Sequence, residues 1–123
     1  MAKEPSQEGG RHSRLRRSFV QGTVKLFILQ QAAYGTVYGR ELSKALGALG
    51  YELSPGTLYP FLHGLEKEKL LRSKIVLVSG RMRRYYELTE DGRVCLAEVR
   101  EELVTLMRKI FSLEESLIQR KPR

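Results

Sequence analysis

A regular series of apolar residues near the end of the chain most constrains its fold. Spacings alternate between three and four residues through Leu96, Val99, Leu103, Leu106, Ile110, Leu113 and Leu117. This pattern predicts a long helix that starts after a Thr89 cap, with Glu90 and Asp91 suiting its positive end. A second apolar row, seven residues apart, widens the stripe at Ala97, Val104, Phe111 and Ile118.

Such a stripe needs apolar cover along several turns. A chain of 123 residues forms one domain, and a single small body cannot easily cover a helix that leaves it. We therefore predict that two copies pair along a dimerisation helix at residues 91–120, with Phe19 contributing to the same interface. The alternative is a helix that folds back onto its own domain.

Three shorter helical patterns precede this helix. Ser18–Ala33 is apolar over much of its girth, Tyr38–Leu49 carries leucines at helical spacing, and Ser54–Leu70 repeats that spacing. In the third pattern Ser54 can cap and Pro55 suits the first helical position. Pro60 lies further in, so we predict an irregular first turn rather than a break. The alternative is a start near Thr57, with Thr57 as the cap.

A β-hairpin is predicted between the third helix and the long one. Ile75–Val78 and Tyr85–Leu88 are strand candidates, and residues 79–84 form the intervening turn. Three short helices followed by a hairpin are the order of a winged helix-turn-helix. The predicted fold is mainly α with a small β-hairpin: a winged-helix domain at 18–90, then the dimerisation helix.

The chain is basic, with 22 Lys and Arg against 14 Asp and Glu and a formal net charge of +8. This balance favours a polyanionic partner such as double-stranded DNA. Residues 1–17 are polar and arginine-rich, which predicts a disordered arm. The arm either contacts phosphates or is a solvated tail.

The element order suggests where DNA would bind. The third helix is a candidate for the major groove, the preceding helix for phosphate contacts, and the hairpin tip for a flanking groove. The first turn of the third helix also offers backbone N–H groups to phosphate. Each group taken alone could equally be solvated surface, and Tyr59 could be a packing residue. The candidate DNA-binding residues are Arg40, Lys44, Ser54, Thr57, Tyr59, Pro60, His63, Arg81, Arg83 and Arg84.

Other functions find little support in the sequence. The single cysteine, Cys95, excludes a disulfide framework or a zinc site built on several cysteines, and we interpret it as a small buried residue. The two histidines, His12 and His63, are not spaced to act as a base for a nucleophile. The sequence also contains no glycine-rich phosphate-binding motif. We expect no enzyme activity, metal, cofactor or membrane span, and a cytoplasmic location.

Several short motifs resemble the PadR family of bacterial transcriptional regulators. The resemblance runs from about Phe19 to Leu96. Its most specific part is Gly56-Thr57-Leu58-Tyr59-Pro60 followed by Leu65-Glu66. The remaining matches are Tyr38-Gly39, Glu41-Leu42, Leu70-Leu71, Gly80-Arg81, Tyr85-Tyr86, Leu88-Thr89 and Asp91-Gly92-Arg93. Two departures are Arg40, where the family often has an aromatic residue, and Lys69, where glycine is common.

The resemblance implies a winged-helix homodimer, joined through the C-terminal helix, that binds an inverted-repeat operator and usually represses. Family DNA contacts carry over to Thr57, Tyr59, Pro60 and the wing arginines, and the chain looks like the subgroup with a short C-terminal helix. Some relatives bind planar drugs between tryptophans, which this chain lacks.

A small-molecule effector of unknown identity is still conceivable, since Phe19, Met107 and Phe111 could line an apolar cavity between subunits. Plain core packing is the favoured interpretation of these three residues. The alternative function is a winged-helix module that binds a protein partner through its basic face.

Overall fold

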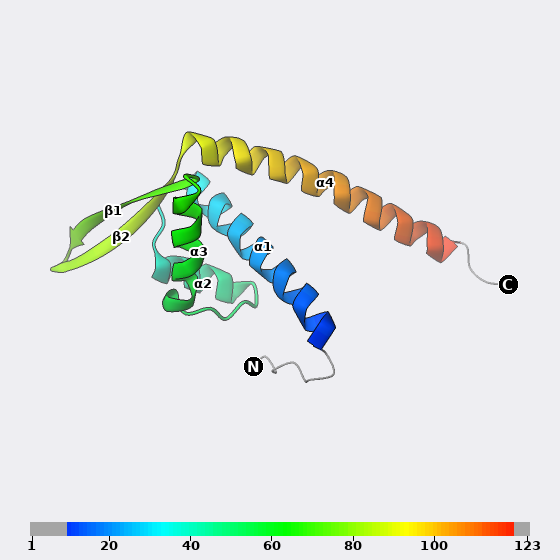
Figure 1. Cartoon of the computed structure of the whole chain (residues 1–123), viewed down its shortest axis with the longest axis horizontal. Coiled ribbons are helices and arrows are strands. Elements are labelled where there is room, and N and C mark those ends of the chain that lie inside the picture. Colours follow the sequence, from blue (N-terminus) through cyan, green and yellow to red (C-terminus); the bar gives the residue numbers. More distant parts are fainter. Residues whose placement is uncertain (1–9, 120–123) are drawn as a thin grey trace.

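The computed structural model describes the backbone of residues 10–119 and the side chains of residues 13–112. Three helices form the body, a two-stranded hairpin projects from it, and a long helix leaves in another direction (Figure 1). This arrangement confirms the predicted class, mainly α with a β-hairpin wing. The elements in chain order are α1 (Gly10–Tyr34), α2 (Gly39–Ala48), α3 (Pro55–Lys67), β1 (Leu71–Val78), β2 (Arg81–Leu88) and α4 (Glu90–Gln119).

The core lies where the three body helices meet the base of the hairpin and the start of α4. An antiparallel bridge between Val37 and Tyr86 ties the α1–α2 link to β2, with N–H···O distances of 2.9 and 2.8 Å. Burying this leucine-rich set supplies most of the stabilising free energy. The core residues are Val24, Ile28, Leu29, Ala32, Val37, Leu42, Leu46, Leu58, Leu62, Leu65, Leu71, Tyr86, Leu88 and Leu96.

Helix α1 begins eight residues earlier than predicted. It starts at Gly10, so residues 10–17 of the predicted disordered arm are helical, and residues 1–9 lie outside the described residues. Arginine and leucine are good helix formers, and no proline or glycine interrupts the segment after Gly10. High charge alone was therefore a poor indicator of disorder here.

Helix α3 begins at Pro55, which confirms the predicted Ser54 cap and excludes the alternative start near Thr57. The Ser54 side chain accepts a hydrogen bond from the Thr57 amide at 3.2 Å, and Pro55 occupies the first helical position. The helix passes through Pro60 without the predicted irregular turn. Pro60 lacks the N–H that would reach Gly56, but Gly56 is exposed, so its carbonyl oxygen can bond water.

The end of α3 shows the conformation that Lys69 adopts, at the position where the resemblance led us to expect glycine. Lys69 adopts the left-handed conformation, with φ 66°. Its amide bonds the Glu66 carbonyl at 2.9 Å, and the Leu70 amide bonds the Leu65 carbonyl at 3.0 Å. This Schellman motif ends the helix three residues before the predicted Leu70. A non-glycine residue in this conformation is disfavoured by roughly 1–2 kcal/mol.

Both strands of the hairpin, hereafter the wing, are longer than predicted. Ser79 and Gly80 have φ values of 50° and 79°, and they form a two-residue turn of the I′ type. Strand pairing therefore continues to Val78 opposite Arg81. The wing arginines lie in β2 rather than in a loop, because a tight turn with two positive φ values needs only two residues.

Helix α4 starts at a crowded junction. The predicted Thr89 cap is confirmed: its hydroxyl accepts from the Gly92 amide at 2.9 Å and donates to the Lys69 carbonyl at 2.7 Å. A Cβ on Gly92 would lie 2.2 Å from the Leu70 carbonyl oxygen and 2.7 Å from Leu88 Cδ1. Only glycine fits here, since the nearest atom belongs to the backbone.

We predict that Gly92→Ala lowers the free energy of unfolding by about 1–3 kcal/mol, because a methyl group must displace the Leu70 carbonyl. Urea denaturation followed by circular dichroism measures the change. The matched control is Gly22→Ala in α1, where an added Cβ meets nothing within 4 Å. That control should be neutral or stabilising. Equal stability for the Gly92 variant and the native chain would contradict the crowded junction.

Candidate nucleic-acid interface

One open cleft gathers residues from α2, α3 and the wing. Its volume is about 290 Å³. It combines three arginines with aromatic and apolar side chains, a composition suited to a polyanion that also has flat or apolar surfaces. The lining residues are Tyr38, Gly39, Arg40, Pro55, Tyr59, Leu62, Met82, Arg83, Arg84 and Tyr86.

The solvent face of α3 presents four of the candidate residues predicted from sequence, Thr57, Tyr59, Pro60 and His63. Tyr59 is 47% exposed and its ring stacks on His63, with centroids 5.6 Å apart. Pro60 and His63 are exposed beside it. Tyr59 is therefore a surface residue. Ser54 differs from the others because its hydroxyl is used in the α3 cap, where it also lies 3.0 Å from the Thr57 hydroxyl.

Arg83 is held on one face of the wing by two tyrosines. Its guanidinium lies over the Tyr38 ring, 4.3 Å from the centroid, and Nη1 lies 3.5 Å from the Tyr85 hydroxyl. Tyr38 and Tyr85 meet edge to face at 5.4 Å. The hydrogen bond to Tyr85 is the main cause that raises the pKa of Arg83. Arg83 thus connects the wing to the start of α2 through cation–π contact.

Sequence reasoning missed both tyrosines as partners of Arg83. Tyr85 follows Arg83 by two positions, so alternation along a strand could have placed the two side chains on one face. Tyr38 could not have been found in this way, because it reaches Arg83 only through the tertiary fold.

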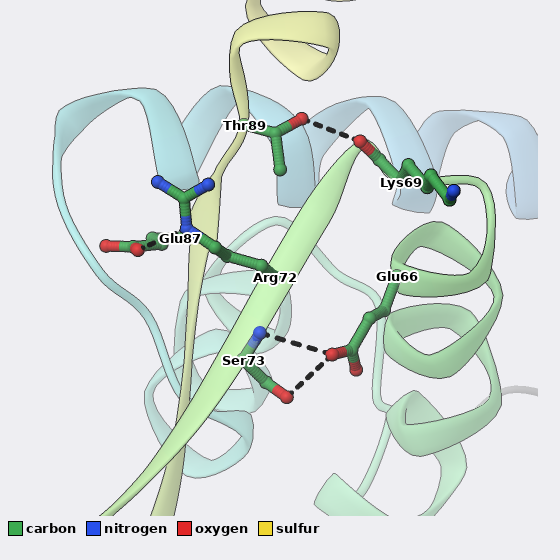
Figure 2. Close-up of polar contacts among 6 residues, drawn as sticks. All are labelled: Glu66, Lys69, Arg72, Ser73, Glu87 and Thr89. Atoms are coloured by element: carbon green, nitrogen blue, oxygen red, sulfur yellow. Dashed lines mark hydrogen bonds and ion pairs between the residues drawn. The ribbon is translucent and has the colours of Figure 1, made fainter.

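The opposite face of the wing is fixed to α3 by a carboxylate. Glu66 accepts hydrogen bonds from the Ser73 amide at 3.2 Å and the Ser73 hydroxyl at 2.8 Å (Figure 2). Arg84 Nη1 lies 3.0 Å from the same hydroxyl. The wing is therefore held on both faces, by Arg83 on Tyr38 and by Ser73 on Glu66.

Two further groups at the base of the wing have shifted pKa values. Arg72 and Glu87 form an exposed ion pair at 2.7 Å across the strands (Figure 2), and the Arg72 hydrogen bond lowers the pKa of Glu87. Any stability from this pair is present above the unfolded-state pKa and lost as pH falls through the lower folded value. Burial raises the pKa of Tyr86, which favours its neutral form.

The cleft brings together some candidate DNA-binding residues and not others. Arg40, Tyr59, Arg83 and Arg84 line it. Lys44 is exposed further along α2, and Arg81 is exposed beside the turn at the outer end of the wing. These two side chains extend the basic surface beyond the cleft.

An apolar surface covers one side of α4, away from the cleft. We call the exposed side chains Leu103, Leu106, Met107 and Ile110 the α4 stripe. Val99 is half-buried at its start. On α1, Phe19 is 66% exposed.

One predicted interface residue has a different role. Leu96 is only 5% exposed and packs in the core of its own subunit, so it offers no surface to a partner. The heptad spacing alone does not distinguish Leu96 from the exposed members of the series. Leu96 is buried because the first turns of α4 pack against the body. Leu113 and Leu117 lie outside the residues whose side chains are described.

Other kinds of site are not seen in the described part of the chain. Within residues 13–112, no group of three or more His, Cys, Asp or Glu side chains could hold a metal ion. None of the described helices combines the length and the apolar character that a membrane crossing requires. Cys95 is a free, half-buried cysteine.

The helical body, the exposed face of α3 and the basic wing define a winged-helix DNA-binding fold. Residues 28–98 match the Transcriptional regulator PadR-like family. The chain therefore belongs to this family of transcriptional regulators, as the sequence motifs suggested.

Individual relatives agree with the family assignment. The chain is 46% identical over 95 residues to the transcriptional regulator Rv3488 of Mycobacterium tuberculosis. The matched segment covers 77% of this chain and 89% of that protein. A PadR family regulator from Eggerthella lenta superposes with a TM-score of 0.72 at 29% identity, covering 88% of this chain and 96% of that one. A PadR-like regulator from Bacillus cereus gives a TM-score of 0.70 at 31% identity, with coverage of 78% and 95%.

We predict that Glu66→Ala lowers the free energy of unfolding by about 1–3 kcal/mol, because the half-buried Ser73 amide loses its acceptor. Thermal and urea denaturation measure the loss. Glu66→Gln should recover part of it, since the amide oxygen still accepts. Glu68→Ala, at an exposed carboxylate on the same helix end, is the control. A loss no larger than that of the control would contradict this role of Glu66.

Proposed function

We propose that this regulator binds double-stranded DNA as a homodimer, with α3 in the major groove and the wing on the flanking groove. The observation that carries the proposal is the cleft in which Tyr59 of α3 and Arg83 and Arg84 of the wing lie together. A duplex that contacts the exposed face of α3 then meets the wing arginines as well. Aromatic and cationic groups on one surface fit bases and phosphates together.

The start of α3 is the part that would read bases. Tyr59 and His63 offer a hydroxyl and an imidazole to base edges, and Pro60 offers an apolar contact to a thymine methyl group. Thr57 is exposed one turn before Pro60 and Phe61. The first-turn amides add the positive end of the helix dipole, which favours a phosphate.

The arginines have distinct roles in this arrangement. Arg81 and Arg84 are exposed and can reach phosphates, as can Arg40 and Lys44 on α2. Arg83 is partly covered by Tyr38 and mainly sets the angle of the wing. We therefore infer that loss of Arg83 changes both the charge and the position of the wing.

Dimerisation is supported by the α4 stripe and by exposed Phe19. Four large apolar side chains are exposed together on one face of α4. A contiguous apolar patch of this kind is typical of a surface that binds a partner. A second copy of the same stripe is the simplest cover, because a two-fold interface is self-complementary. Two copies also double the reading surface, which matches an inverted-repeat operator.

Charge favours an antiparallel pairing of the two α4 helices. Glu102 and Lys109 flank the stripe on one edge, seven residues apart, and both are exposed. If Leu103 meets Leu106 of the partner subunit, Glu102 falls opposite Lys109 of the partner subunit, twice per dimer. The two bodies then lie at opposite ends of the helix pair. Their attachments near Leu96 would be roughly 25 Å apart along the axis.

We infer that a dimer with this symmetry would present its two α3 helices to successive major grooves, which lie about 34 Å apart. Binding of such a dimer across a promoter would block transcription, so repression is the proposed outcome. An effector that shifts the α4 helices would alter the separation of the two α3 helices and hence the affinity. The interface around Phe19, Met107 and Phe111 is where such a molecule would act.

We predict that Tyr59→Ala weakens binding to a selected operator by about tenfold or more, through loss of base contact. Arg81→Ala should weaken all duplexes alike and reduce the salt slope by about one, because it removes one phosphate contact. Operators are first selected from random duplexes, and affinities are then measured by gel shift over a salt series. Arg108→Ala, an exposed arginine that faces away from the α4 stripe, is the control.

These measurements also separate the protein-interaction alternative. A module that uses its basic face for a protein would show salt-sensitive binding without preference for any selected site. If both the Tyr59 and the Arg81 variants keep native folds by circular dichroism and unchanged DNA affinity, the assignment of α3 and the wing as DNA-contacting elements is wrong.

We predict that Leu106→Glu yields monomers, since it places a carboxylate in the centre of the α4 stripe. Light scattering measures the mass, and Arg108→Glu on the opposite face is the control. Lys109→Glu should weaken the dimer, and Glu102→Lys in the same chain should restore it if the helices run antiparallel. A dimeric Leu106→Glu protein would reject the interface, and failed restoration would reject the antiparallel register.

A further inference from the structure

The outer end of the wing carries exposed apolar side chains. Leu77 and Met82 are 65% and 69% exposed, and they are direct cross-strand partners. Ile75, 49% exposed, is the next residue on the same face of β1. Directly opposed strand residues lie on one face with their side chains close together. The hairpin projects from the body (Figure 1). Leu77 and Met82 thus form an apolar pair next to its turn.

This pair lies on the α3 side of the wing. Ser73 and Tyr86 occupy the same face nearer the base, because strand residues alternate. Ser73 is bonded to Glu66 of α3, and Met82 lines the cleft that also holds Tyr59. A duplex docked on α3 therefore meets the face of the wing that carries the apolar pair.

Basic residues surround the pair. Arg84 lies opposite Ile75 on the same face, and Arg81 and Arg83 extend from the other face of β2. A two-stranded sheet has two open edges, and exposed apolar side chains on such edges favour aggregation. The partner that suits this surface must carry negative charge around a recess that accepts apolar groups. The minor groove of a duplex has both properties, with phosphates along its rims and base steps at its floor.

We propose that Leu77 and Met82 form an apolar wedge that enters the minor groove beside the α3 contact, partly unstacks one base step and bends the duplex. This inference rests on the proposed function and adds a mode of recognition to it. Leucine and methionine are among the side chains that insert between base steps. The free-energy cost of unstacking is offset because the bent duplex contacts more of the protein surface.

The wing has the reach and stiffness for this role. It extends five residues beyond Ser73 to Val78, which corresponds to roughly 16–17 Å. Its base is fixed by Glu66 on one face and Tyr38 on the other, and its end is closed by a two-residue turn. The pair is therefore presented at a set position relative to α3.

Insertion gives specificity at base pairs that α3 does not contact. Pyrimidine–purine steps such as TA unstack and kink with least resistance. We expect selected operators to carry such a step on each flank, outside the sequence contacted by α3. Replacing that step with a stiff A-tract should weaken binding by about tenfold.

The test uses the full chain and a selected operator that contains 2-aminopurine at one flanking position at a time. Native protein should raise the fluorescence at one step per flank and shorten the end-to-end distance measured by energy transfer between labelled duplex ends. The Leu77→Thr/Met82→Gln variant should lose both signals and about tenfold in affinity, because the apolar burial is lost. Val76→Thr, on the opposite face of β1, is the control and should keep both signals.

Specific binding by the native protein with no fluorescence rise and no bend would overturn the wedge and leave the proposed function standing. Absence of any site preference would overturn both. A change in the mass of DNA-free protein caused by the wing substitutions would also overturn the wedge, because it would assign the apolar pair to contact between copies of the chain. Light scattering on the same samples gives this result, and the native-protein signals do not depend on how the variants fold.

Discussion

The junction of β1, β2 and α4 determines how the rest of the structure is placed. Thr89 donates from its backbone and its hydroxyl to the carbonyls of Leu70 and Lys69, while Gly92 lies against the Leu70 carbonyl with no room for a Cβ. Because backbone atoms meet here, the base of the wing and the axis of α4 are set by covalent geometry and hydrogen bonds more than by adjustable side chains. The directions of the wing and of α4 are thus fixed together.

From this junction the molecule points two surfaces in different directions. The wing and α3 form a basic, aromatic face, and α4 carries an apolar stripe away from the body. A mechanical link between them would pass through the same few residues, since any rotation of α4 must act on Leu70 and Leu88. This gives a physical route by which a change at the proposed dimer interface can reach the proposed DNA-binding face.

Contacts on both faces hold the wing against the body, and a loop that only carried arginines would lack these contacts. Arg83 rests on Tyr38 at one face, and Ser73 is bonded by Glu66 at the other. Part of the positive charge is therefore used to hold the wing against the body, and Arg81 and Arg84 remain exposed. Charge counted from sequence overstates the number of arginines free for phosphate, because one of them has an internal aromatic partner.

The sequence by itself determined the order of elements, the α3 cap at Ser54, the α4 cap at Thr89 and the apolar series of α4. These depend on local rules: capping geometry, helical period and the chemistry of adjacent residues. Only the tertiary structure decided that Leu96 is core while Leu103 is surface, because the boundary is set by where α4 leaves the body. It likewise decided which arginine meets Tyr38 and which wing face turns toward α3, since those contacts join residues up to 45 positions apart.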